Sequence, residues 1–64
     1  MTVDDYWAEL RSLGLRGRQR ISEESYIMQT RDGDVAQIPD PALHAADERD
    51  AIMAMLRKRH GLLS

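Results

Sequence analysis

Residues 25–38 read SYIMQTRDGDVAQI, two strand-like runs separated by Asp32 and Gly33. An Asp-Gly pair between two such runs is a strong signal for a β-hairpin. A two-residue turn would place Thr30 opposite Val35, whereas a type I turn with a bulge at Gly33 would place Thr30 opposite Asp34. We favour the bulged register, because it puts four apolar side chains on one face of the hairpin. These four are Tyr26, Met28, Ala36 and Ile38.

A helix is predicted before the hairpin, over about residues 3–13. Thr2 is a suitable N-cap, and five apolar residues that follow it share one helical stripe. Gly14 and Leu15 then supply the glycine and the apolar residue of a Schellman ending. Residues 16–24 show no period and predict a polar loop. The stripe consists of Val3, Tyr6, Trp7, Leu10 and Leu13.

A second helix is predicted after the hairpin, beginning near His44 or Ala45. Two prolines at positions 39 and 41 end the second strand before it. Acidic residues fill the first turns of this helix and basic residues fill its last turn, which suits the helix dipole at both ends. Gly61 and Leu62 repeat the Gly-Leu ending. The predicted buried stripe is Ala45, Ile52, Met55 and Leu56, with Met53 at its flank.

These elements predict one α+β domain over residues 1–64, in the order α-β-β-α. Two helices would pack on a two-stranded antiparallel hairpin. The core is small, because the chain has 64 residues with one tryptophan, no phenylalanine and no cysteine to form a disulfide. Chains of this size gain little net stability from burial alone. Self-association or a protein partner is therefore expected.

Composition also indicates where the chain acts. No apolar run approaches the ~20 residues of a membrane span, so no membrane association is expected. The acidic start MTVDD lacks the basic and apolar regions of a signal peptide, and a cytoplasmic location is expected. The net charge of −2 is unlike that of a dedicated nucleic-acid binder, which is usually basic.

The leading functional hypothesis is a protein–protein interaction module or an accessory subunit, with homodimerisation as one form of it. An isolated hairpin is marginal and leaves two sheet edges unpaired. Apolar residues also remain outside the predicted core. Their positions mark the expected partner surface, which combines Ile27, Val35 and Met53.

The alternative hypothesis is nucleic-acid binding through a basic loop. Three arginines alternate in residues 16–20, and a lysine near the C-terminus adds a further cation. These cations could contact phosphates. A solvated loop is the simpler interpretation, since no aromatic residue is interleaved among the arginines to stack on bases. The candidate phosphate contacts are Arg16, Arg18, Arg20 and Lys58.

Catalysis is not expected. No serine or threonine has a histidine at a telling spacing, and His44 and His60 are the only imidazoles. A core this small does not readily enclose a substrate pocket. The sequence therefore predicts a non-enzyme with no catalytic residue, no metal, no cofactor and no small-molecule substrate.

The turn and cap residues of the second half form a recognisable pattern. Residues 30–33 read TRDG, residues 38–41 read IPDP, and Glu48-Arg49 follow. The pattern TRDG…IPDP…ER resembles small uncharacterised bacterial proteins of similar length. The resemblance implies no particular function.

Overall fold

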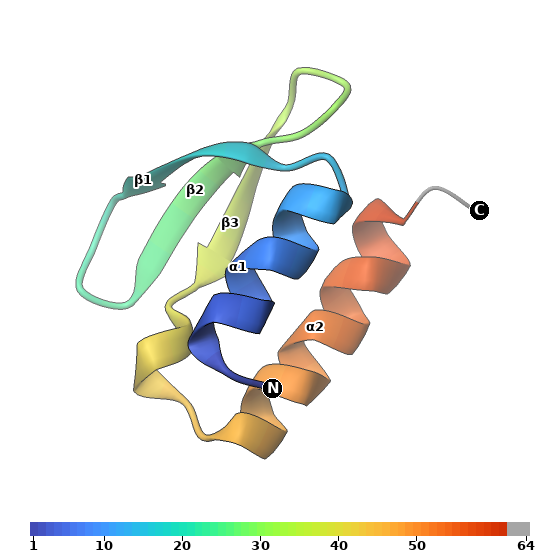
Figure 1. Ribbon diagram of the computed structural model, residues 1–64. Helices are drawn as coiled ribbons and strands as arrows, with labels where there is room; N and C mark the ends of the chain where they lie inside the picture. The colour runs from blue at the N-terminus through green and yellow to red at the C-terminus, as the bar shows by residue number, and fades with distance from the viewer. Residues whose placement is uncertain (62–64) are drawn as a thin grey trace.

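The computed structural model describes residues 1–61 and has two layers, a three-stranded sheet and two helices that cover one of its faces (Figure 1). In chain order the elements are α1 (Val3–Ser12), β1 (Arg16–Arg20), β2 (Ser25–Gln29), β3 (Val35–Pro39), the 3-10 helix η1 (Pro41–Leu43) and α2 (Ala46–His60). The strands are antiparallel and lie in the order β1-β2-β3. The α+β class is confirmed, but the predicted two-stranded hairpin is wrong, because a third strand extends it. Across residues 1–61 no helix is both long and apolar enough to cross a membrane.

The third strand is β1, which occupies part of the segment predicted as a polar loop. All five of its residues are exposed, so no apolar alternation marks the strand in the sequence. Backbone pairing with β2 holds it in place, with Gln19 opposite Ile27 and Arg20 opposite Tyr26. The prediction failed because this strand is specified by its neighbour in space and not by burial of its own side chains.

A bulge interrupts the pairing of β1 with β2. Arg16 lies opposite Gln29, and the register then shifts before Gln19, so that Gly17 and Arg18 together face a single residue of β2. Gly17 has a φ of +70°, the left-handed conformation that a glycine supplies at such bulges. Because of the bulge, Arg16 is in regular pairing with β2, whereas Arg18 lies within the bulge.

The hairpin of β2 and β3 adopts the bulged register, as predicted. The N–H of Thr30 donates to the carbonyl of Asp34 at 2.8 Å, and Gly33 has a φ of +89°. The pairing then continues without interruption along both strands. As expected, four apolar side chains share the face that the helices cover. They are Tyr26, Met28, Ala36 and Ile38.

The predicted ends of α1 are confirmed. The hydroxyl of Thr2 accepts the N–H of Asp5 at 3.0 Å, which caps the helix. Gly14 has a φ of +90°, and the N–H of Leu15 donates to the carbonyl of Leu10 at 3.1 Å. This is the Schellman ending, and it directs the chain from the helix into β1.

The predicted ends of α2 need correction. The helix begins at Ala46, and its N-cap Ala45 has no side-chain acceptor; instead the carboxylate of Glu48 accepts the N–H of Ala45 at 2.8 Å. Gly61 has a φ of −66° and an extended backbone, so it does not form the predicted left-handed ending. Leu62, the other residue of that prediction, lies outside the described residues.

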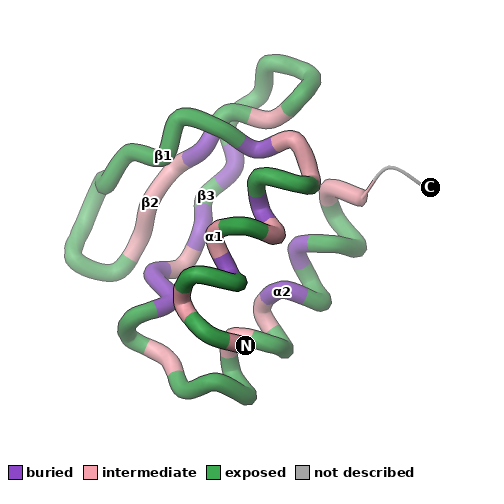
Figure 2. Tube along the Cα trace, in the orientation of Figure 1, coloured by how far each residue is buried: buried purple, intermediate pink, exposed green. Residues whose placement is uncertain are grey.

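The core lies where the two helices meet the sheet, as Figure 2 shows. The predicted stripe of α2 is wrong in two respects. Met53 is fully buried while Met55 is 46% exposed, and Ala45 is an exposed N-cap that precedes the helix. The inward stripe passes through Arg49, a charged residue that the apolar pattern does not include. The buried apolar residues are Tyr6, Leu10, Leu15, Met28, Ala36, Ile38, Met53 and Leu56.

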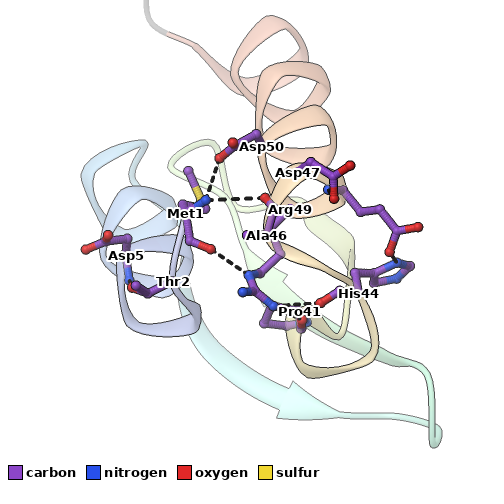
Figure 3. A network of polar contacts seen from close by, with 10 residues as sticks. Met1, Thr2, Asp5, Pro41, His44, Ala46, Asp47, Arg49 and Asp50 are labelled. Atoms are coloured by element: carbon purple, nitrogen blue, oxygen red, sulfur yellow. Dashed lines mark hydrogen bonds and ion pairs between the residues drawn. The ribbon is translucent and has the colours of Figure 1, made fainter.

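Arg49 joins three segments of the chain (Figure 3). Its guanidinium donates to the carbonyls of Met1 at 2.7 Å, Pro41 at 3.1 Å and His44 at 2.6 Å. The amino group of Met1 in turn donates to the carboxylate of Asp50 at 2.7 Å. The network fixes the start of α1 beside the start of α2, so both helices run in the same direction across the sheet (Figure 1).

Candidate binding site between α1 and β1

A hollow opens between α1 and the edge strand β1. Four residues of α1 line one wall, at the spacing of a single helical face. The first three residues of β1 line the other wall, and two apolar side chains form the floor. The lining residues are Asp4, Trp7, Ala8 and Arg11 from α1, Arg16, Gly17 and Arg18 from β1, and Leu15 and Met28.

Arg18 lies over the ring of Trp7, which lines this hollow, and near the ring of Tyr26, which lies beside it. Its guanidinium carbon is 4.3 Å from the centre of the Trp7 ring and 5.7 Å from that of the Tyr26 ring. Trp7 and Tyr26 meet edge to face, with ring centroids 5.0 Å apart. An exposed cation–π contact contributes about 0.5–1 kcal/mol. The contact therefore orients Arg18 without neutralising its charge.

No carboxylate neutralises Arg18 within residues 1–61. The ion pairs of this part of the chain involve other cations, and neither Arg11 nor Arg16 takes part in them. Asp4 is the one acidic residue that lines the hollow. The three arginines therefore give the hollow a net positive charge, although the whole chain is acidic.

Arg20 has a different, structural role. Its guanidinium donates to the carboxylate of Asp40 at 2.8 Å and to the carbonyl of Ser22 at 2.9 Å, and it also covers the ring of Tyr26. The hydrogen bond from Arg20 holds the pKa of Asp40 below its usual value, against the opposing effect of burial. Asp40 also caps η1 by accepting the N–H of Ala42 at 3.0 Å. Arg20 thus ties β1 to the segment that follows β3.

The predicted phosphate contacts are therefore only partly brought together. Arg16 and Arg18 both line the hollow, Arg20 is occupied by Asp40, and Lys58 belongs to α2 and is not among the lining residues. Arg11 also lines the hollow, although it is not one of the predicted phosphate contacts. The basic segment is a strand and not the predicted loop.

The predicted partner surface of Ile27, Val35 and Met53 is not assembled. By the strand register, Ile27 and Val35 share the sheet face that the helices leave uncovered; Val35 is 66% exposed. Met53 is fully buried on the opposite side, within the core. The prediction is wrong for Met53, because α2 turns that residue, and not Met55, toward the sheet.

The aromatic part of the site was missed in the sequence. The basic segment itself contains no aromatic residue, whereas Trp7 comes from α1 and Tyr26 from β2. The sequence does carry a signal for the strand itself, since Arg18 and Arg20, two positions apart, are typical of one face of a strand. An edge strand often carries such charges, which discourage pairing with other chains.

No family model, no curated protein and no solved structure matches the chain. The resemblance to small bacterial proteins stays a prediction.

Proposed function

We propose that this chain is a protein–protein interaction module that binds an acidic, extended segment of a partner protein in the hollow between α1 and β1. The observation that supports the proposal most directly is Arg18, which is oriented by Trp7 yet has no carboxylate partner among the described residues. A partner carboxylate would complete this arrangement with a charge-assisted hydrogen bond, which is stronger than a bond between neutral groups.

Three other guanidinium groups of the fold support the proposal by contrast. Arg20 pairs with Asp40, Arg57 pairs with Glu9, and Arg49 donates to backbone carbonyls. These arginines stabilise contacts between elements. Arg11, Arg16 and Arg18 have no ion pair and no side-chain hydrogen bond within residues 1–61, and they line one hollow, which is the arrangement expected of groups that serve a ligand.

The shape of the hollow favours a chain segment over a small molecule. Its volume is about 780 Å³, but it is open to solvent along α1 and β1. Small-molecule sites usually bury most of the ligand surface, which an open hollow does not do. An extended segment can instead place carboxylates on the arginines and an apolar side chain on Ala8 and Met28. Catalysis is not part of the proposal.

Single-stranded nucleic acid is the second candidate for the same hollow. The stacked pair of Trp7 and Arg18 favours it, because aromatic rings and guanidinium planes are the platforms on which bases stack. Two features favour the acidic protein segment instead. Asp4 can accept a hydrogen bond from a peptide N–H, a donor that a phosphodiester backbone lacks, and the exposed Ala8 offers an apolar contact for a side chain of the segment.

Binding of two matched probes tests the proposal. A short glutamate peptide and an oligothymidylate of equal charge, both fluorescently labelled, are titrated with the full chain at ~50 mM salt while anisotropy is recorded. We expect the peptide to bind more tightly, and Arg18→Gln to weaken its binding about ten-fold, the loss of one charge-assisted hydrogen bond. Lys58→Gln removes the same charge outside the hollow and should leave binding nearly unchanged.

The possible outcomes separate the candidates. Tighter binding of the oligothymidylate, with the same loss on Arg18→Gln, would replace the acidic segment by nucleic acid. Equal effects of Arg18→Gln and Lys58→Gln would mean that only the overall charge matters, which contradicts a site in this hollow.

A further inference from the structure

The two edges of the sheet differ in how they are protected. β1 carries three arginines and a bulge, which are devices that discourage pairing with another strand. β3 has the sequence VAQIP, without a charged residue, and pairs with β2 in regular register along its length. The free edge of β3 is therefore a template for a further strand.

The backbone groups available on β3 follow from the hydrogen-bond pattern. The N–H of Thr30 donates to Asp34 just before β3, and the N–H of Asp40 donates to Glu24 just after it. Because hydrogen-bonded and non-hydrogen-bonded pairs alternate in an antiparallel ladder, every second residue from position 35 directs its backbone away from β2. These residues are Val35, Gln37 and Pro39.

Pro39 limits the free edge at one end. It has no N–H to donate, and its carbonyl already accepts the hydroxyl of Tyr6 at 2.8 Å. The free groups of β3 are therefore the N–H and C=O of Val35 and of Gln37. Val35 is also the most exposed of the large apolar residues within positions 1–61, at 66%.

We propose that a second copy of this chain pairs with β3, so that two sheets join into one continuous antiparallel sheet. A two-fold axis at Ala36 sets Val35 opposite Gln37 of the second copy, and Gln37 opposite Val35 of the second copy. This pairing satisfies all the free backbone groups of both edges. It is isologous, so it closes as a dimer and does not propagate.

The charges near β3 agree with this pairing. In this register Asp34 lies opposite Ile38 of the second copy, so the two Asp34 residues are separated by four strand positions, about 13 Å. That distance exceeds the Debye length of about 8 Å at physiological ionic strength. The two Asp34 residues are therefore largely screened from each other. Asp34 lies nearer to Asp40 of the second copy, about 7 Å along the strand, but Arg20 neutralises that carboxylate.

The second helix supplies charge complementarity. α2 runs near β3, since Arg59 and Val35 line a common hollow. Its first turn carries Asp47 and Glu48, and its last turn carries Arg57, Lys58 and Arg59. The two-fold axis that makes the β3 strands antiparallel also reverses α2, so the acidic start of one helix lies toward the basic end of the other.

Backbone substitution at the edge tests the proposal. Sedimentation velocity of the full chain should give twice the 7.3 kDa monomer mass at high micromolar concentration. Gln37→Pro removes the outward N–H without removing a bond to β2, and it should raise the dimer dissociation constant at least ten-fold. Gln37→Ala keeps the N–H and should remain dimeric. A wild-type monomer at every concentration, or a dimer that persists in Gln37→Pro, overturns the proposal.

A second variant covers the case in which Gln37→Pro does not fold. Val35→Lys places a charge on the edge while leaving the backbone of β3 intact, and it should be monomeric with an unchanged circular dichroism spectrum. Hydrogen exchange adds an independent readout. The amides of Val35 and Gln37 should become more protected as concentration rises, whereas that of Arg20 on the opposite edge should not. A Val35→Lys variant as dimeric as the wild type, or amides without added protection, overturns the proposal.

Discussion

The guanidinium carbon of Arg18 lies 4.3 Å from the centre of the Trp7 ring, which brings an edge strand and the first helix into direct contact. Trp7 contacts Tyr6 and Tyr26 edge to face, so the ring is held from several sides. Arg18 therefore has a defined orientation although it is exposed. A charged side chain that is oriented but not neutralised is the basis of the proposed binding site.

The two partners of this contact should differ in their effect on stability. Trp7→Ala removes a half-buried ring that packs against the core, and it should lower the free energy of unfolding by about 2 kcal/mol, less than the 3–5 kcal/mol of a fully buried ring. Arg18→Gln should lower it by no more than about 1 kcal/mol, the value of an exposed cation–π contact. Urea denaturation measures both. A larger loss for Arg18→Gln would indicate a structural role and weaken the binding proposal.

Tyr6 should ionise only at high pH. Burial, assisted by the nearby Asp40, raises the pKa of Tyr6 to about 12. Because the folded pKa lies above the unfolded value of about 10, the protonated phenol stabilises the fold fully below pH ~10, and this contribution is lost as the pH rises toward 12. In Tyr26→Phe, Tyr6 is the remaining tyrosine, so tyrosinate absorbance reports it alone. Ionisation near pH 10 without unfolding would contradict the buried position.

Gly14 should tolerate substitution less well than Gly33. Both residues have a left-handed backbone, so an alanine at either position costs about 1–2 kcal/mol. A Cβ at Gly14 would also collide with the side chain of Arg31, whereas nothing lies near the Cβ position at Gly33. Thermal unfolding of Gly14→Ala and Gly33→Ala should therefore show the larger decrease for Gly14→Ala. The reverse order would contradict the close contact of Arg31 with the end of α1.

Arg49 should matter more to stability than other cations of α2. Arg49→Ala removes hydrogen bonds to three carbonyls and separates the start of α1 from α2, and we expect a loss of about 2 kcal/mol. Lys58→Ala, at an exposed position of the same helix, should change stability by less than about 0.5 kcal/mol. Chemical denaturation compares the two, and equal losses would contradict the network of Figure 3.

The hairpin could be predicted in detail because its signals are local. The Asp32-Gly33 turn and the alternation of apolar residues fix the register within a few positions along the chain. The Thr2 cap and the Gly14-Leu15 ending are local as well, and both are present. In contrast, β1 buries none of its residues and is placed by its backbone pairing with β2. No local pattern in its own sequence therefore predicts it.

The candidate site was predictable only in part for a similar reason. The sequence predicted Arg16 and Arg18 as part of a site, but the aromatic residues near them, Trp7 and Tyr26, come from other elements. The predicted inward face of α2 is wrong because the true face includes Arg49. A charged residue does not extend an apolar stripe, so the sequence pattern favoured a different face. Contacts between segments distant in the sequence therefore determine which residues line the candidate site and which residues stay exposed.

The most direct test of an acidic segment bound between α1 and β1 uses Trp7, the only tryptophan, which lies inside the proposed site. Its fluorescence is recorded while the full chain is titrated with a short glutamate peptide at ~50 mM salt, where electrostatic binding is strong. We expect a saturable change in emission whose midpoint concentration rises about ten-fold in Arg18→Gln and stays nearly the same in Lys58→Gln. Emission that stays constant in the wild-type chain, while labelled peptide binds, would place the peptide elsewhere and contradict the account.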